Sequence, residues 1–124
     1  MSALLTVDDL RRLPDPRATP DDCACAVLKC EGWESVSAPP GEPMLRHLGT
    51  LRDPAVDEPT LEERHEAGSR YGSAHAPVAP ACFPYNRCEV WACAACGRGF
   101  VQYTEYGGYY VDHRLREVDP ALVR

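Results

Sequence analysis

Short stretches with helical or strand-like spacing of apolar residues alternate along this chain with proline-rich connections. Three stretches open with a threonine followed by acidic residues, the sequence signature of a capped helix start. A proline or glycine follows each stretch and can end the helix. The predicted helices cover residues 7–13, residues 20–30 and a short segment that begins at residue 60.

Strand-like alternation is clearest in the second half of the chain. Two weaker stretches flank a Pro/Gly loop, two stronger ones flank a Cys-x-x-Cys turn, and a last one follows a Gly-Gly pair. The predicted strands cover residues 33–36, 45–51, 89–92, 100–104 and the segment after residue 108. Gly107 and Gly108 can both adopt positive φ, which favours a two-residue hairpin turn.

A two-residue turn fixes which residues of this hairpin lie opposite one another. The predicted pairs are Tyr106 with Tyr109, Thr104 with Val111, Gln102 with His113, and Phe100 with Leu115. These residues share the more apolar face, so we expect that face to be buried. The opposite face mixes aromatic and charged side chains and is expected to be exposed. It carries Val101, Tyr103, Glu105, Tyr110, Asp112 and Arg114.

These elements predict an α+β fold: a small zinc-ribbon-like antiparallel sheet with short N-terminal helices and long proline-rich loops. The 12 prolines and 9 glycines agree with long irregular connections. A chain of 124 residues is expected to form a single domain, residues 1–124. Within it we expect a helical N-terminal part, residues 1–44, and a zinc-knuckle and hairpin part, residues 45–124.

Charge and composition limit the partners and the cellular compartment that we expect for this chain. With 13 basic and 19 acidic residues the formal net charge is -6, which disfavours binding to nucleic acid. The N-terminus has neither a basic signal region nor a sustained apolar run, so we expect a cytoplasmic protein that does not enter a membrane. Seven cysteines, an odd number, then indicate reduced thiols and metal ligands more than disulfides.

The strongest chemical signal is the pair Cys93 and Cys96 followed by Gly97. One tight turn can point both thiolates at a single zinc ion, which takes four ligands in structural sites. Cys88 is the nearest third ligand, although a straight strand would separate its Cα from that of Cys93 by about 16 Å. For the fourth ligand we prefer His65 and keep Cys82 and His75 in reserve. The predicted site therefore holds one zinc ion through Cys88, Cys93, Cys96 and His65.

Other interpretations of the cysteines stay open. Cys23, Cys25 and Cys30 are either small buried hydrophobic residues or metal ligands, and a Cys-x-Cys spacing on a helix favours the former because it points the two side chains to different faces. The spacing from Cys88 through Cys93 to Cys96 also matches the loop of plant-type [2Fe–2S] proteins. That cluster needs a further cysteine downstream, and none follows Cys96.

Several strings together resemble a family of small uncharacterised bacterial proteins. They are LGTLRDP at 48–54, PT with EE and His65 at 59–65, FPYNRC at 83–88 and YTEYGGYYVD at 103–112. The resemblance covers about residues 45–118. It implies that Cys93, Cys96, Cys88 and His65 form the family's site, and it implies no activity. The knuckle itself is similar to rubredoxin-like zinc ribbons.

Three classes of function are consistent with these features. The first is a zinc-stabilised protein-interaction module, an adaptor or a small inhibitor, including an immunity-type protein that neutralises a basic toxin. Its expected contact residues are Tyr103, Glu105, Tyr110, Asp112 and Arg114, because Tyr and Arg are enriched at binding hot spots. The second is an enzyme with a zinc-activated water, although no catalytic motif selects a base. The third is an iron–sulfur or thiol redox protein.

Overall fold

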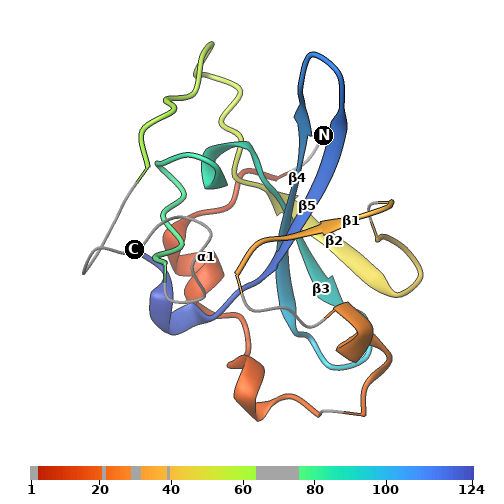
Figure 1. Cartoon of the computed structure of the whole chain (residues 1–124). Helices are drawn as coiled ribbons and strands as arrows, with labels where there is room; N and C mark the ends of the chain where they lie inside the picture. Colours follow the sequence, from red (N-terminus) through yellow and green to blue (C-terminus); the bar gives the residue numbers. More distant parts are fainter. Residues whose placement is uncertain (1–2, 21, 29–31, 39, 64–75) are drawn as a thin grey trace.

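The computed structural model describes residues 3–20, 22–28, 32–38, 40–63 and 76–124, and these residues form one twisted antiparallel sheet with short helical segments around it (Figure 1). The sheet has five strands in the order β1-β5-β4-β3-β2. The strands are β1 (Glu34–Val36), β2 (Leu45–Thr50), β3 (Glu89–Cys93), β4 (Gly99–Tyr106) and β5 (Val111–Glu117). The predicted α+β fold, a small antiparallel sheet with short helices, is confirmed.

Helical structure in the described residues is limited to one α-helix and four 3-10 turns. They are α1 (Val7–Arg11), η1 (Pro16–Ala18), η2 (Ala24–Leu28), η3 (Tyr85–Arg87) and η4 (Pro120–Leu122). The capping box that predicted α1 is present: Thr6 Oγ1 accepts from the Asp9 N–H, and the Asp9 carboxylate accepts from the Thr6 N–H. No helix in this part of the chain is long and apolar enough to cross a membrane.

The other two predicted helices differ from the structure. Of the segment predicted as a helix over residues 20–30, the structure describes residues 20 and 22–28, and these form only η2. Thr19 does not cap a longer helix, because its hydroxyl donates to Pro16 O and accepts from Arg98. Residues 60–63 are not helical, and the rest of the third predicted helix lies outside the described residues.

The hairpin register is shifted by two residues from the predicted one. Tyr106 lies opposite Val111 and Gln102 opposite Leu115, so four residues connect the strands, and the Gly107 N–H donates to Tyr110 O. A shift of two keeps each side chain on its expected face of the sheet. The register prediction was wrong because the Gly-Gly pair begins a longer turn instead of forming the whole of a two-residue one.

On this hairpin, burial depends more on how far a residue lies from the turn than on which face of the sheet it occupies. Val101 and Tyr103 are buried although their face was expected to be exposed, and Tyr106 and Val111 are exposed although theirs was expected to be buried. Val101 and Tyr103 belong to a hydrophobic cluster with Leu10 of α1 and with residues from the segment before β3 and from the C-terminal segment. The base of the hairpin, the end far from the turn, is therefore packed on both faces. The tip, the end that carries the turn, is not covered by the described residues.

Two hydrophobic clusters form the core. The larger contains Leu10, Leu51, Val78, Tyr85, Cys88, Val90, Val101, Tyr103, Val118 and Val123. The smaller contains Cys25, Leu45, Cys93, Phe100 and Leu115. Phe100 and Val101 are neighbours on β4 and point to opposite faces, so each face of the sheet carries one cluster. Two cysteines lie in the smaller cluster, and this places the candidate site on that face.

The N-terminal segment joins the sheet at β2, and this close approach depends on Gly49. The N–H of Leu5 donates to Thr50 O, and the N–H of Thr50 donates to Ala3 O. A Cβ at position 49 would lie 2.4 Å from Ala3 O and 2.8 Å from Leu5 Cγ. Backbone atoms cannot move aside as a flexible side chain can, so glycine is required here.

We therefore expect Gly49→Ala to lower the free energy of unfolding by about 1–3 kcal/mol, the usual cost of overpacking. Gly108→Ala is the matched control, because a Cβ there meets no atom within 4 Å. Urea denaturation of both variants measures the difference. Equal stability of the two variants would show that the N-terminal segment is not held against β2.

Candidate metal centre

The turn between β3 and β4 presents two cysteines at its ends. The Cys93 N–H donates to Arg98 O at 2.8 Å, and the Gly97 N–H donates to Cys93 O at 2.9 Å. Gly97 has φ of 84°, a conformation that side chains disfavour. These bonds curl the chain beneath Cys93 and Cys96, as the Cys-x-x-Cys-Gly sequence predicts.

Two more cysteines approach this turn from the N-terminal part of the chain. Cys23 immediately precedes η2, and Cys25 lies within it. The Cys23 Sγ is 3.5 Å from the Cys93 Sγ, and the Cys25 Sγ is 3.5 Å from the Cys96 Sγ. All four sulfur atoms lie within 4.8 Å of one another.

This spacing matches the geometry of a single four-coordinate ion. A tetrahedron with metal–sulfur bonds of about 2.3 Å places its sulfur atoms about 3.8 Å apart. The observed pairs at 3.5 Å and the upper limit of 4.8 Å bracket that value. Cys23, Cys25, Cys93 and Cys96 can therefore hold one metal ion.

The site is partly buried, and its thiols have unequal acidity. Burial raises the pKa of Cys25 and of Cys96. Burial also acts on Cys93, but there the N–H groups of Cys96 and Ala95 stabilise the thiolate and lower the pKa to about 6. The N–H groups beside Cys93 favour its thiolate, and a bound cation would stabilise further thiolates in this site.

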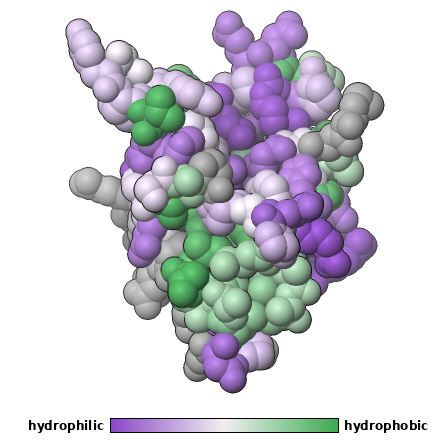
Figure 2. Space-filling view, turned by 90° about the vertical axis from the view of Figure 1, so that its right-hand side faces the viewer, coloured by the Kyte–Doolittle hydropathy of each residue, from purple (hydrophilic) through white to green (hydrophobic). Residues whose placement is uncertain are grey.

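The four cysteines pack with apolar side chains in the smaller hydrophobic cluster. Figure 2 shows hydrophobic residues gathered at the lower end of the molecule, the end where Figure 1 places η2 and the β3–β4 turn. Val27 of η2 is 80% exposed, and the exposed Met44 accepts a backbone hydrogen bond from Ala94. The apolar packing of the smaller cluster, to which neither Val27 nor Met44 belongs, limits the access of water to the cysteines and strengthens charge interactions among them.

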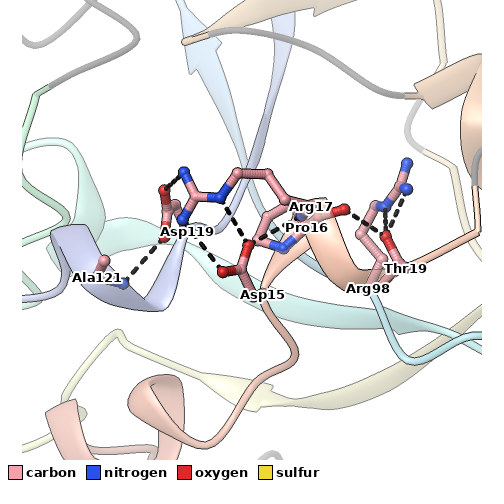
Figure 3. Close-up of polar contacts among 7 residues, drawn as sticks. All are labelled: Asp15, Pro16, Arg17, Thr19, Arg98, Asp119 and Ala121. Atoms are coloured by element: carbon pink, nitrogen blue, oxygen red, sulfur yellow. Dashed lines mark hydrogen bonds and ion pairs between the residues drawn. The ribbon is translucent and has the colours of Figure 1, made fainter.

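Arg98 connects the two halves of the site. Its side chain is fully buried and donates from Nε and Nη2 to Thr19 Oγ1 at 2.9 and 2.5 Å, as Figure 3 shows. Nη1 lies 3.9 Å from the Glu117 carboxylate, and the Arg98 backbone N–H hydrogen-bonds the Cys96 sulfur. One residue therefore fixes the chain that leads into Cys23 relative to the knuckle that carries Cys93 and Cys96.

The other predicted ligands that the structure describes, Cys88 and Cys82, lie away from the four-sulfur group. Cys88 is fully buried in the larger hydrophobic cluster, where its thiol donates to Pro84 O at 3.4 Å. Burial, with a smaller effect of Glu89, raises its pKa well above the usual value. Cys82 is half-buried and also lies outside the four-sulfur group. His65, His75 and Cys30 lie outside the described residues.

Cys23 and Cys25 are the candidate ligands that sequence reasoning considered but ranked below Cys88 and His65. A regular helix would have turned their side chains apart, but Cys23 precedes η2 and the helical segment is a short 3-10 turn. The available signal was the count of ligands: a Cys-x-Cys pair and a Cys-x-x-Cys pair together supply the four thiolates of a structural zinc site.

The predicted partner-binding residues lie on the β4–β5 hairpin. Tyr103 is only 5% exposed and packs against Trp33, with ring centroids 5.1 Å apart, so the expectation of an exposed side chain was wrong. Tyr110 is 54% exposed, and its hydroxyl donates to Glu105. Glu105, Asp112 and Arg114 form an ion-pair network at 3.2 and 3.6 Å.

The two tyrosines are therefore expected to behave differently on truncation. Tyr103→Ala removes a buried ring and should lower the free energy of unfolding by about 3–5 kcal/mol. Tyr110→Ala changes an exposed side chain and should cost less than about 0.5 kcal/mol. Urea denaturation monitored by tryptophan fluorescence measures both. A similar loss in the two variants would place Tyr110 in the core with Tyr103.

Comparisons with known proteins leave the family of this chain open. No family model matches the sequence, and no curated protein or solved structure matches it at a significant level. The functional interpretation therefore depends on the four-cysteine site and on the surfaces around it.

Proposed function

We propose that this chain is a zinc-stabilised protein-interaction module, an adaptor or a small inhibitor, without catalytic activity of its own. The observation that carries the proposal is the group of four sulfur atoms within 4.8 Å, contributed by two segments about 70 residues apart. Four cysteine thiolates are a ligand set typical of structural zinc, and a metal held by both segments stabilises the packing of η2 against the sheet.

The number and spacing of the thiolates favour this function over the two alternatives. A catalytic zinc keeps one position for water, whereas four cysteines complete a tetrahedron. A two-iron cluster divides its thiolates between two metal atoms and so separates the pairs, whereas here all four sulfur atoms fit around one centre.

The tip of the β4–β5 hairpin is the surface that we assign to a protein partner. Figure 1 shows the tip projecting beyond the neighbouring strands. Three tyrosines and a valine are exposed there, with exposed fractions of 78% for Tyr106, 104% for Tyr109, 54% for Tyr110 and 58% for Val111. Tyrosine supplies a large contact area at low entropic cost and is enriched at hot spots of interfaces.

The structure below the tip supports a rigid presentation of these side chains. Arg114 contacts both Glu105 and Asp112, and the base of the hairpin is packed on both faces. A surface that is ordered before binding loses less entropy when it binds. The net charge of -6 favours a basic partner, which agrees with an inhibitor of the immunity type.

The experiment compares capture by the intact protein with capture by a tip variant. The variant Tyr106→Ser, Tyr109→Ser, Tyr110→Ser removes the exposed rings, and Val27→Ser is a control at an exposed position away from the hairpin. We expect the tip variant to fold with bound zinc and to lose a partner that the control retains, and binding of the purified partner to weaken at least about 100-fold. Unchanged binding of every captured protein would contradict the proposal.

A further inference from the structure

A cavity of about 590 Å³ lies apart from the metal centre and the hairpin tip. Its walls come from the N-terminal segment, from the loop after β2 and from the segment before η3. Apolar side chains dominate the walls, namely those of Leu4, Leu5, Leu51, Val56, Pro59 and Pro80. Leu4 and Val56 remain 47% and 43% exposed, so apolar surface that a compact domain would normally cover lies open here. The volume is within the usual range for small-molecule sites.

Polar contacts hold the walls in place without filling the cavity. Arg52 donates its guanidinium N–H groups to the backbone oxygens of Asp53, Val56 and Asp57 and so shapes the loop. Asn86 Nδ2 donates to Thr60 O at 2.8 Å, which fastens this loop to the segment beneath it. The cavity is therefore formed before any ligand binds, which lowers the entropic cost of binding.

The charged groups of the lining are mainly acidic. Asp53 and Glu58 line the cavity, and Asp53 Oδ1 also accepts from the Ala55 N–H at 2.9 Å. Among the described residues of the lining, Arg52 carries the one cation, and its donors are directed at backbone oxygens. The two carboxylates therefore give the cavity a net negative charge, which favours a ligand that carries a positive charge.

We propose that this cavity binds a small organic amine, a molecule with an apolar body and a protonated nitrogen. The apolar body contacts Leu4, Leu51 and Val56, and the nitrogen lies in the field of Asp53 and Glu58. The charge of the lining and the net charge of the protein both favour a cation. The site is independent of the metal centre and of the tyrosine tip.

The test is a titration of the zinc-loaded protein with two probes of equal size and opposite charge. The probes are 4-phenylbutylamine and 4-phenylbutanoate, followed by two-dimensional NMR of backbone and methyl groups. We expect saturable shifts at Leu4, Leu51 and Val56 with the amine, and an affinity for the carboxylate at least about tenfold weaker, because Asp53 and Glu58 repel an anion. Equal affinities would overturn the assignment to amines.

Two variants locate the binding and its charge preference. Val56→Phe fills the cavity from an exposed position and should abolish the shifts, whereas Val111→Phe is a matched exposed control on the hairpin that should leave them unchanged. Asp53→Asn with Glu58→Gln should reduce the preference for the amine about tenfold with little change in folding. Shifts that survive Val56→Phe, or a preference that survives the loss of both carboxylates, would contradict the proposal.

Discussion

Replacing Cys93 by serine is expected to lower the free energy of unfolding of the zinc-loaded protein by more than about 3 kcal/mol. Metal binding to a structural zinc site supplies folding free energy directly, and a small domain has only about 5–15 kcal/mol of total stability. The N–H groups of Cys96 and Ala95 also lower the pKa of Cys93, so serine removes a ligand whose thiolate the fold stabilises. Urea denaturation monitored by circular dichroism, with and without a chelator, measures the loss.

The control for this experiment is Cys82→Ser. Cys82 is half-buried and lies outside the four-sulfur group, so its replacement removes a thiol without removing a ligand. We expect Cys82→Ser to retain metal and to change stability by less than about 1 kcal/mol. If the chelator destabilises the Cys93→Ser variant as much as the unmodified protein, the metal is not held by Cys93.

Replacing Arg98 by methionine is expected to weaken zinc binding by about 10–100-fold, the usual effect of losing a residue that orients metal ligands. Methionine retains an unbranched side chain of similar length, and the backbone N–H that hydrogen-bonds the Cys96 sulfur is unchanged. The change removes the bonds to Thr19 and Pro20 and the interaction with Glu117. Competition with a chromophoric chelator measures the affinity.

Stability should fall in the same variant by about 1–3 kcal/mol, because Thr19 and Glu117 each lose a contact with the buried guanidinium. The variant Arg98→Met with Glu117→Gln separates the two effects. It should recover part of the stability while the weak zinc binding persists, since neither change restores the contact with Thr19. Recovery of both quantities together would show that Arg98 acts only through its charge and does not position the ligands.

The elements that the sequence predicted correctly are those formed by interactions between residues close together in the chain. The capping box at Thr6 and Asp9 defines the start of α1, and the knuckle at Cys93, Cys96 and Gly97 forms the expected tight turn. Each of these features depends on hydrogen bonds between residues a few positions apart, so its residues can be recognised in a short window of sequence.

The features that were missed depend on contacts between distant segments. Cys23 meets Cys93 across 70 positions, and Thr19 meets Arg98 across 79, so neither contact leaves a mark in the local pattern. The same contacts explain why the described residues of the predicted second helix form only a short 3-10 turn, because the Thr19 oxygen that would cap a helix accepts from Arg98 instead. Tyr103 was predicted to be exposed because the alternation along its strand places it on the less apolar face of the hairpin. Residues from distant segments pack on that face and bury it.

X-ray absorption at the zinc edge, on the protein purified with its bound metal, tests the central claim most directly. We predict one zinc per chain with four sulfur neighbours at about 2.3 Å and no nitrogen or oxygen neighbour in the first shell. A first shell that contains a histidine nitrogen or a water oxygen, or a protein that carries iron instead of zinc, would contradict a closed site formed by Cys23, Cys25, Cys93 and Cys96.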